Sequence, residues 1–199
     1  MFTGQMRKEK IMRHVQIILG PPGTGKTTTL LNIVEQSLAR GIEPERIAYL
    51  AFTRKAAHEA QERAMEKFGF DTGRFPFFRT LHSLAFKRLG LKRDEIMTDK
   101  HFRNIGKAMG IEFKGIYDED LGVHIGMGLG DKCSRVESLS RVGLRSLEKQ
   151  YEYINENDLS LHAVKQYSEA LQKYKKQNKL LDFTDMLEKF HEPLPIDVC

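Results

Sequence analysis

The stretch Gly20-Pro21-Pro22-Gly23-Thr24-Gly25-Lys26-Thr27 decides the fold, because it matches the phosphate-loop pattern G-x-x-x-x-G-K-[ST]. Upstream, residues 14–19 (HVQIIL) form a short apolar run that predicts a buried strand entering the loop. From Lys26 onward, apolar residues recur at helical spacing on one face until Gly41. The motif therefore lies between a predicted strand and a predicted helix, which is the context that its chemistry requires.

This loop suits the phosphates of a nucleoside triphosphate. Its glycines let backbone N–H groups curl around phosphate oxygens, and the following helix directs its positive end at the same anion. We expect Lys26 to reach the β- and γ-phosphates and the Thr27 hydroxyl to coordinate Mg²⁺, so these are the candidate catalytic residues and Thr27 is the candidate metal ligand. The predicted nucleotide-binding residues are Gly20, Pro21, Pro22, Gly23, Thr24, Gly25, Lys26, Thr27 and Thr28. A plain Gly/Pro turn is the alternative, and the complete match disfavours it.

Bulk composition allows several functions. The 199 residues suit one domain with a large insertion or two small domains, and 40% hydrophobic content indicates a folded protein. A net charge of +5 permits a polyanionic partner without requiring one. Cys133 and Cys199 have no paired spacing, so neither a disulfide framework nor a cysteine zinc site is expected. No apolar stretch is long enough to cross a bilayer, and we expect a cytoplasmic protein with no membrane partner.

Downstream of the loop, strand and helix patterns alternate as far as residue 89, and a helical pattern rich in charged residues follows. Residues 46–52 predict a second strand and residues 55–68 a second helix, so that with the strand at 14–19 and the helix from Lys26 the order is β-α-β-α. Residues 75–79 are a candidate third strand, and residues 81–89 predict a helix. Residues 90–179 are rich in charge and predict a helical insertion with helices at 99–109, 139–153 and 160–177. Glycines at alternate positions predict a loop at 122–130. The sequence thus divides into a first part at 1–89, the insertion at 90–179 and a return at 180–199.

Three further segments resemble, in the same order, motifs of the superfamily 1 helicases of the UvrD, Rep and PcrA group. Residues 47–57 (IAYLAFTRKAA) look like motif Ia, usually T-F-T-N-K-A-A, from which Ala51 and Arg54 depart. Residues 78–85 (FRTLHSLA) resemble motif Ib, and residues 181–187 (LDFTDML) resemble the family's L-D-F-x-D-L-L. The resemblance implies an α/β P-loop NTPase fold, with a RecA-like parallel sheet and an inserted α-helical subdomain. It also implies ATP and Mg²⁺ as cofactors and single-stranded DNA as partner.

In that family, motifs Ia and Ib face single-stranded DNA. The resemblance makes Phe52, Thr53, Arg54, Thr80, His82 and Ser83 the candidate nucleic-acid-binding residues. Phe52 offers a stacking face, and the hydroxyl and imidazole groups offer donors for phosphate oxygens. Taken singly, each residue also has a structural interpretation, in which Phe52 ends a core strand and Thr80 caps the next helix.

Two other features carry weaker signals. Gln5 lies 21 positions before Lys26, close to the spacing at which relatives place a glutamine that reads adenine, although residues 1–11 are equally consistent with a flexible extension. The lysines at 173, 175, 176 and 179 lie on a basic helix surface that is more typical of a solvated face than of a DNA track.

The sequence shows no strand ending in Asp-Glu, the second acidic motif that an NTPase of this class needs for Mg²⁺ and the attacking water. Asp94-Glu95 and Asp118-Glu119-Asp120 are interpreted as surface charge, and residues 195–199 resemble the start of the strand that in relatives runs into D-E-A-Q-D. We therefore expect a fragment ending before that motif, with further C-terminal helicase domains in the full-length protein, weak nucleotide binding and negligible hydrolysis. The oligomeric state cannot be inferred from the sequence.

The leading hypothesis is the ATP-binding front part of a 3′-5′ DNA helicase or translocase, with the polarity implied by the resemblance alone. A stand-alone module that binds nucleotide or single strands without motor activity is one alternative. An AAA+ or Upf1-like ATPase is another, disfavoured because neither carries F-T-x-K-A-A followed by L-D-F-x-D.

Overall fold

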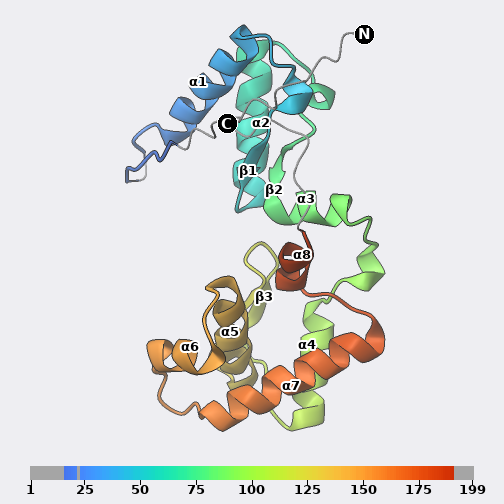
Figure 1. Ribbon diagram of the computed structural model, residues 1–199. Helices are drawn as coiled ribbons and strands as arrows, with labels where there is room; N and C mark the ends of the chain where they lie inside the picture. The colour runs from blue at the N-terminus through green and yellow to red at the C-terminus, as the bar shows by residue number, and fades with distance from the viewer. Residues whose placement is uncertain (1–15, 22, 191–199) are drawn as a thin grey trace, which may run out of the picture.

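The computed structural model describes residues 16–21 and 23–190 and consists mostly of helices with two small sheets. Figure 1 shows an upper part with α1, α2, β1 and β2 and a lower part with α4 to α7, while α3 and α8 lie between them. Helices α3 (Leu81–Arg88) and α8 (Phe183–Lys189) pack against each other, so segments about a hundred positions apart in the chain meet where the two parts join.

Downstream of the phosphate loop, the upper part contains the predicted helix, strand and helix, and a second strand follows them. Its elements are α1 (Lys26–Ala39), β1 (Tyr49–Ala51), α2 (Arg54–Phe68) and β2 (Phe78–Thr80), with short 3-10 turns at Pro44–Arg46 and Thr72–Arg74. Strands β1 and β2 are parallel, with Tyr49 opposite Phe78 and Ala51 opposite Thr80. Helix α2 buries its alanines at 57, 60 and 64, which lets the helix backbone lie close to the two strands. The parallel pairing is thus confirmed, on a sheet of two strands.

The prediction of a strand at 14–19 is wrong for residues 16–19, the part of it that the structure describes. Residues 16–19 have no regular secondary structure, and the apolar side chains of Ile17 and Leu19 are exposed. A central parallel strand gains its stability from hydrogen-bonded neighbours, and within the described residues β1 and β2 pair only with each other. Residues 16–19 pair with neither strand, and the wider RecA-like sheet is not formed by the described residues.

The lower part is predominantly helical. It contains a 3-10 turn at Arg93–Glu95, α4 (Asp99–Met109), β3 (Ile116–Asp118), β4 (Val123–Ile125), α5 (Leu129–Val142), α6 (Leu147–Ile154) and α7 (Leu161–Asn178). Its core gathers Phe102, Ile105, Phe113, Val136, Val164, Tyr167 and Leu171 from α4, the following loop, α5 and α7. Helix α4 has the predicted bounds, and α7 differs from the prediction by one residue at each end. The domain borders at 90 and 179 stay a prediction.

Two predictions in this part are corrected. A single helix at 139–153 is wrong, because α5 ends before Gly143 and α6 starts after Ser146, whose side chain accepts the N–H of Lys149. A loop throughout 122–130 is also wrong, because β3 and β4 pair as an antiparallel hairpin and α5 begins at Leu129. The periodicity of residues 139–153 does not reveal that Ser146 caps a new helix. The pairing of β4 depends on β3, which lies outside the predicted loop.

One buried carboxylate explains the compact turn before α5. Asp131 is fully buried, and its Oδ2 accepts backbone N–H groups from Lys114, Gly115 and Gly128 at 2.9–3.0 Å. A Cβ at Gly126 would approach Asp131 Oδ2 to 2.4 Å, so only glycine fits there.

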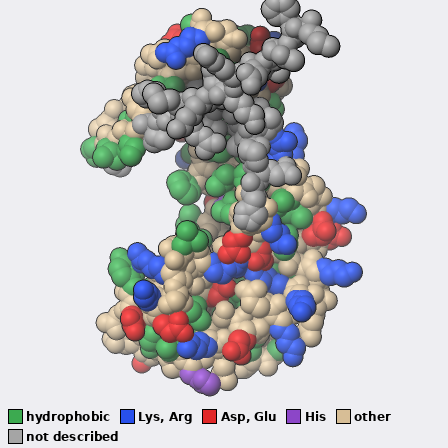
Figure 2. Space-filling model, viewed as in Figure 1, with side chains coloured by type: hydrophobic (Ala, Val, Ile, Leu, Met, Phe, Trp, Pro, Cys, Tyr) green, Lys and Arg blue, Asp and Glu red, His purple; other side chains and the backbone are tan. Residues whose placement is uncertain are grey.

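No helix in the described part of the chain is long and apolar enough to span a bilayer. On the face drawn in Figure 2, Lys and Arg side chains of the lower part are interspersed with Asp and Glu. That face therefore does not present a single continuous basic surface to a polyanion.

Candidate nucleotide and nucleic-acid sites

The phosphate loop leads into the first turn of α1. Gly23 and Gly25 have φ values of 81° and 79°, in the left-handed region that glycine adopts without strain. The Lys26 ammonium donates hydrogen bonds to the carbonyl oxygens of Gly20 at 2.6 Å and Pro21 at 2.7 Å, and the Thr24 hydroxyl donates to Pro21 at 2.8 Å. The loop thus folds back over the lysine. Two predicted ligands, Gln5 and Pro22, lie outside the described residues.

The donor set of this loop fits the phosphates of a nucleotide. Helix α1 starts at Lys26 with Gly25 as its N-cap, no side chain among the described residues caps its first N–H groups, and its first turn carries no acidic residue. The unpaired N–H groups and the positive helix end are therefore free for an anion. Thr27 is half-buried beside Lys26, and Thr28 is exposed. Mg²⁺ would need phosphate oxygens as well as Thr27, since no cluster of three His, Cys, Asp or Glu side chains within 16–21 and 23–190 could hold a metal.

A second site lies where the two parts of the molecule meet. This pocket of about 670 Å³, called the Phe52 pocket below, is lined from α2, β2, α3, the β3–β4 loop and α8. Five of the predicted nucleic-acid-binding residues line it: Phe52, Arg54, Thr80, His82 and Ser83. The sixth, Thr53, caps α2 by accepting the N–H of Ala56 at 3.2 Å. The fold thus brings the candidates from the two motifs into one concave surface.

The structure decides between the alternative roles of two of these residues. Phe52 follows the last residue of β1 and is 86% exposed, so its interpretation as the end of a core strand is wrong. Thr80 is only 7% exposed, and its Oγ1 accepts the N–H of Ser83 at 3.1 Å, so its role as cap of α3 is confirmed. Phe52 therefore offers a free ring face in the pocket, whereas the Thr80 oxygen is already engaged.

His82 and Phe183 form an aromatic wall of the pocket. Their ring centroids lie 5.2 Å apart at an interplanar angle of 71°, an edge-to-face contact. Burial lowers the pKa of His82, while the nearby Asp120 carboxylate opposes this shift. The imidazole is therefore neutral near pH 7 and can donate one hydrogen bond.

The family assignment follows from a comparison with protein-family models. The model of the UvrD/REP helicase N-terminal domain matches residues 3–195, nearly the whole chain. The chain belongs to the UvrD/REP helicase family. It is also similar to DNA helicase IV of Escherichia coli (strain K12), with 41% identity over 73 residues, which are 36% of this chain and 10% of that relative. No solved structure matches significantly.

Membership of the UvrD/REP family implies a P-loop fold, ATP with Mg²⁺, and DNA as the polymer bound. It also removes the AAA+ and Upf1-like alternatives, because the match runs through the phosphate loop, both strand motifs and the L-D-F-x-D segment. The aligned region spans about a tenth of the helicase IV chain, so the activity of a whole helicase is a separate question.

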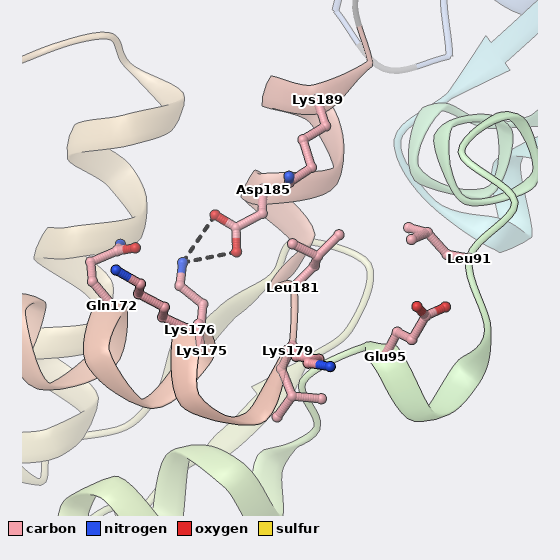
Figure 3. Close-up of a pocket in the computed structure, with 10 residues that line it drawn as sticks. Leu91, Glu95, Gln172, Lys175, Lys176, Lys179, Leu181, Asp185 and Lys189 are labelled. Atoms are coloured by element: carbon pink, nitrogen blue, oxygen red, sulfur yellow. Dashed lines mark hydrogen bonds and ion pairs between the residues drawn. The ribbon is translucent and has the colours of Figure 1, made fainter.

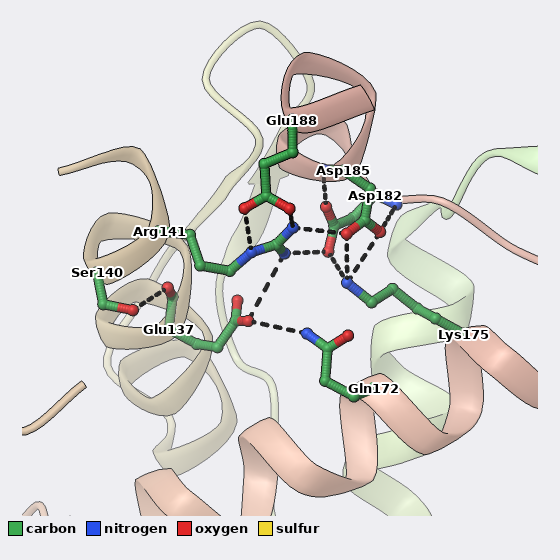
Figure 4. Close-up of polar contacts among 8 residues, drawn as sticks. All are labelled: Glu137, Ser140, Arg141, Gln172, Lys175, Asp182, Asp185 and Glu188. Atoms are coloured by element: carbon green, nitrogen blue, oxygen red, sulfur yellow. Dashed lines mark hydrogen bonds and ion pairs between the residues drawn. The ribbon is translucent and has the colours of Figure 1, made fainter. Parts of the chain in front are cut away.

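The L-D-F-x-D segment of this family member lies in a buried ionic cluster (Figure 4). Lys175 Nζ lies 2.6 Å from Asp182 Oδ2 and 3.0 Å from Asp185 Oδ1, and Arg141 contacts the same two carboxylates at 2.8 and 2.5 Å. Arg141 also binds Glu188, so side chains of α5 and α7 hold α8 in place. This cluster fixes Phe183 and Met186 of α8 in the wall of the Phe52 pocket.

Burial and charge act in opposite directions on the carboxylates of the cluster. Burial raises the pKa of Asp182, but Lys175 and Arg141 outweigh it, and the net pKa is lowered. Glu137 is more weakly paired, with Arg141 Nη1 3.6 Å away, and burial raises its pKa to about 7 despite the arginine. Asp182 is therefore ionised in the fold at neutral pH, as its two cationic partners require.

The interpretation of the lysine run as a solvated face is wrong for Lys175, which is only 4% exposed. Lys176 and Lys179 are exposed and line a cleft of about 410 Å³, which Lys175 and Asp185 of the cluster also line (Figure 3). One member of the run is thus structural. The others stay on the surface.

Sequence reasoning missed several residues of the Phe52 pocket. These are His58 and Gln61 on α2, Arg79 on β2, Phe86 on α3, Arg93, Thr98, and Phe183 and Met186 on α8. The sequence could have indicated Phe183, since it is the phenylalanine of the L-D-F-x-D motif. Arg79 and Met186 also lie within the motif segments 78–85 and 181–187. The others belong to no motif, and only the packing of distant segments places them in the pocket.

Proposed function

We propose that this chain is the N-terminal part of an ATP-dependent 3′-5′ DNA helicase or translocase. In this proposal it binds ATP and Mg²⁺ at the phosphate loop and a single DNA strand in the Phe52 pocket. The observation that carries the proposal is the convergence of motif Ia and motif Ib residues on that one pocket. Family membership supports the helicase class.

The chemistry of the pocket suits an unpaired strand. Phe52 exposes a ring on which a base can stack, and stacking requires a base that is not enclosed in a duplex. Arg54 and Arg79 supply positive charge, and the side chains of His82 and Ser83 supply neutral donors for phosphate oxygens. Stacking and phosphate contacts are independent of base identity, as translocation along DNA requires.

Replacing Phe52 by alanine is expected to weaken binding of a fluorescently labelled single-stranded oligonucleotide about tenfold, the loss of one base–aromatic stack. Fluorescence anisotropy measures the affinity. Because the ring is 86% exposed and contributes little packing, the free energy of unfolding should hardly change.

The matched control is Tyr153→Ala, which removes another exposed aromatic ring, 74% exposed on α6 and outside the Phe52 pocket. Its strand affinity should equal that of the wild type. Equal affinities for wild type and Phe52→Ala would refute the proposed strand site.

We further infer that this chain hydrolyses ATP negligibly by itself. In the described segments, β1 and β2 end at Ala51 and Thr80, and no carboxylate pair follows either strand. The acidic run at 118–120 lies in the β3–β4 hairpin, far along the chain from the phosphate loop, and contacts Arg54. The chain should therefore show phosphate release no faster than its Lys26→Ala variant. Turnover that single-stranded DNA stimulates in the wild type would contradict this inference.

A further inference from the structure

Two acidic residues of the β3–β4 hairpin, Glu119 and Asp120, lie in the Phe52 pocket and bind Arg54, an exposed cation of the pocket. Arg54 Nη2 lies 2.8 Å from Glu119 Oε2, and Arg54 Nε lies 3.3 Å from Asp120 Oδ1. Arg54 belongs to the first turn of α2, whereas both carboxylates come from the lower part of the molecule. The guanidinium that would attract a strand phosphate therefore already has two anionic partners.

The position of these carboxylates is built into the hairpin. Asp118 Oδ1 accepts the N–H groups of Asp120 at 2.9 Å and Leu121 at 3.0 Å, which closes the turn between β3 and β4. Gly122, at φ 68°, brings the turn against Phe183, where an added Cβ would meet the Phe183 Cβ at 3.0 Å. The turn is thus held against α8, on the same wall as His82.

We propose that Glu119 and Asp120 compete with nucleic-acid phosphate for Arg54 and thereby set the affinity of the Phe52 pocket for single strands. A carboxylate and a phosphate present the same pair of anionic oxygens to a guanidinium, so one displaces the other. A strand that engages Arg54 must break both ion pairs and bring its phosphates close to two like charges. The hairpin therefore lowers strand affinity. This inference rests on the proposed function of the pocket.

Removing the two charges by Glu119→Gln with Asp120→Asn is expected to tighten binding of a labelled single-stranded oligonucleotide about three- to tenfold, because exposed ion pairs are individually weak. Arg54 would also gain a phosphate contact. The plot of log affinity against log salt concentration should therefore steepen by about 0.7.

A double-mutant cycle separates competition at Arg54 from a general loss of negative charge. In an Arg54→Gln background the same two hairpin substitutions should give no gain, because the shared partner is absent. A gain of equal size in that background would overturn the proposal, since the carboxylates would then act only by long-range repulsion. The matched control is Glu112→Gln, which breaks another exposed ion pair of the lower part, with Lys114 at 3.2 Å, and should leave strand affinity unchanged.

The outcomes distinguish this inference from the proposed function. If the wild type binds the oligonucleotide and the hairpin variant binds it with the same or lower affinity, the competition is refuted and the strand site stands. If neither the wild type nor the hairpin variant binds, the strand site and the competition fall together.

Discussion

Replacing Lys175 by alanine is expected to lower the free energy of unfolding by about 3–5 kcal/mol. In the buried ionic cluster, the carboxylates of Asp182 and Asp185 would lose one of their two cationic partners. Lys175 is 4% exposed and contacts both Asp182 and Asp185. Arg141 remains, but it is already shared with Glu188. Urea denaturation followed by circular dichroism measures the loss.

The adjacent lysine provides the control. Lys176 is on the same helix and is exposed, so Lys176→Ala removes the same side chain without touching the cluster. It should change the free energy of unfolding by less than about 0.5 kcal/mol. A loss below about 1 kcal/mol in Lys175→Ala would show that the ionic cluster does not hold α8 in place.

Replacing Lys26 by alanine is expected to reduce affinity for Mg²⁺-bound ATP about 100-fold, corresponding to about 3 kcal/mol. The ammonium now binds the carbonyl oxygens of Gly20 and Pro21, and these bonds must be exchanged for bonds to phosphate oxygens. Charge-assisted bonds to phosphate are the stronger ones, so the exchange favours the nucleotide. Titration with a fluorescent ATP analogue measures the change.

The control for this variant is Lys173→Ala, which removes an exposed lysine of α7. It should bind the analogue as the wild type does. If Lys26→Ala retained wild-type affinity, the phosphate loop would not be the nucleotide site.

Local signals predicted much of the fold. Helix α4 has its predicted bounds, and the residues that mark its ends lie next to it: Thr98 precedes its first residue, and Gly110, in the left-handed region, follows its last. The phosphate loop and the two strand motifs were recognised because their residue types are contiguous in the chain.

Contacts between distant segments were not predictable in the same way. Lys175 appeared to belong to a solvated lysine run, since nothing local shows that Arg141, 34 positions upstream, shares its carboxylates. The acidic run at 118–120 appeared to be surface charge, and its contact with Arg54 joins residues 65 positions apart. Strand formation at 16–19 likewise depends on neighbouring strands, which its own apolar pattern cannot reveal.

The most direct test of the strand site is photocrosslinking of the wild-type chain to a single-stranded oligonucleotide that contains bromodeoxyuridine. Mass spectrometry then locates the crosslinked residues. We predict crosslinks at Phe52, His82 or Phe183, whose rings line the pocket. Crosslinks confined to the exposed lysine surface of α7 around Lys173 and Lys176 would contradict the proposed site.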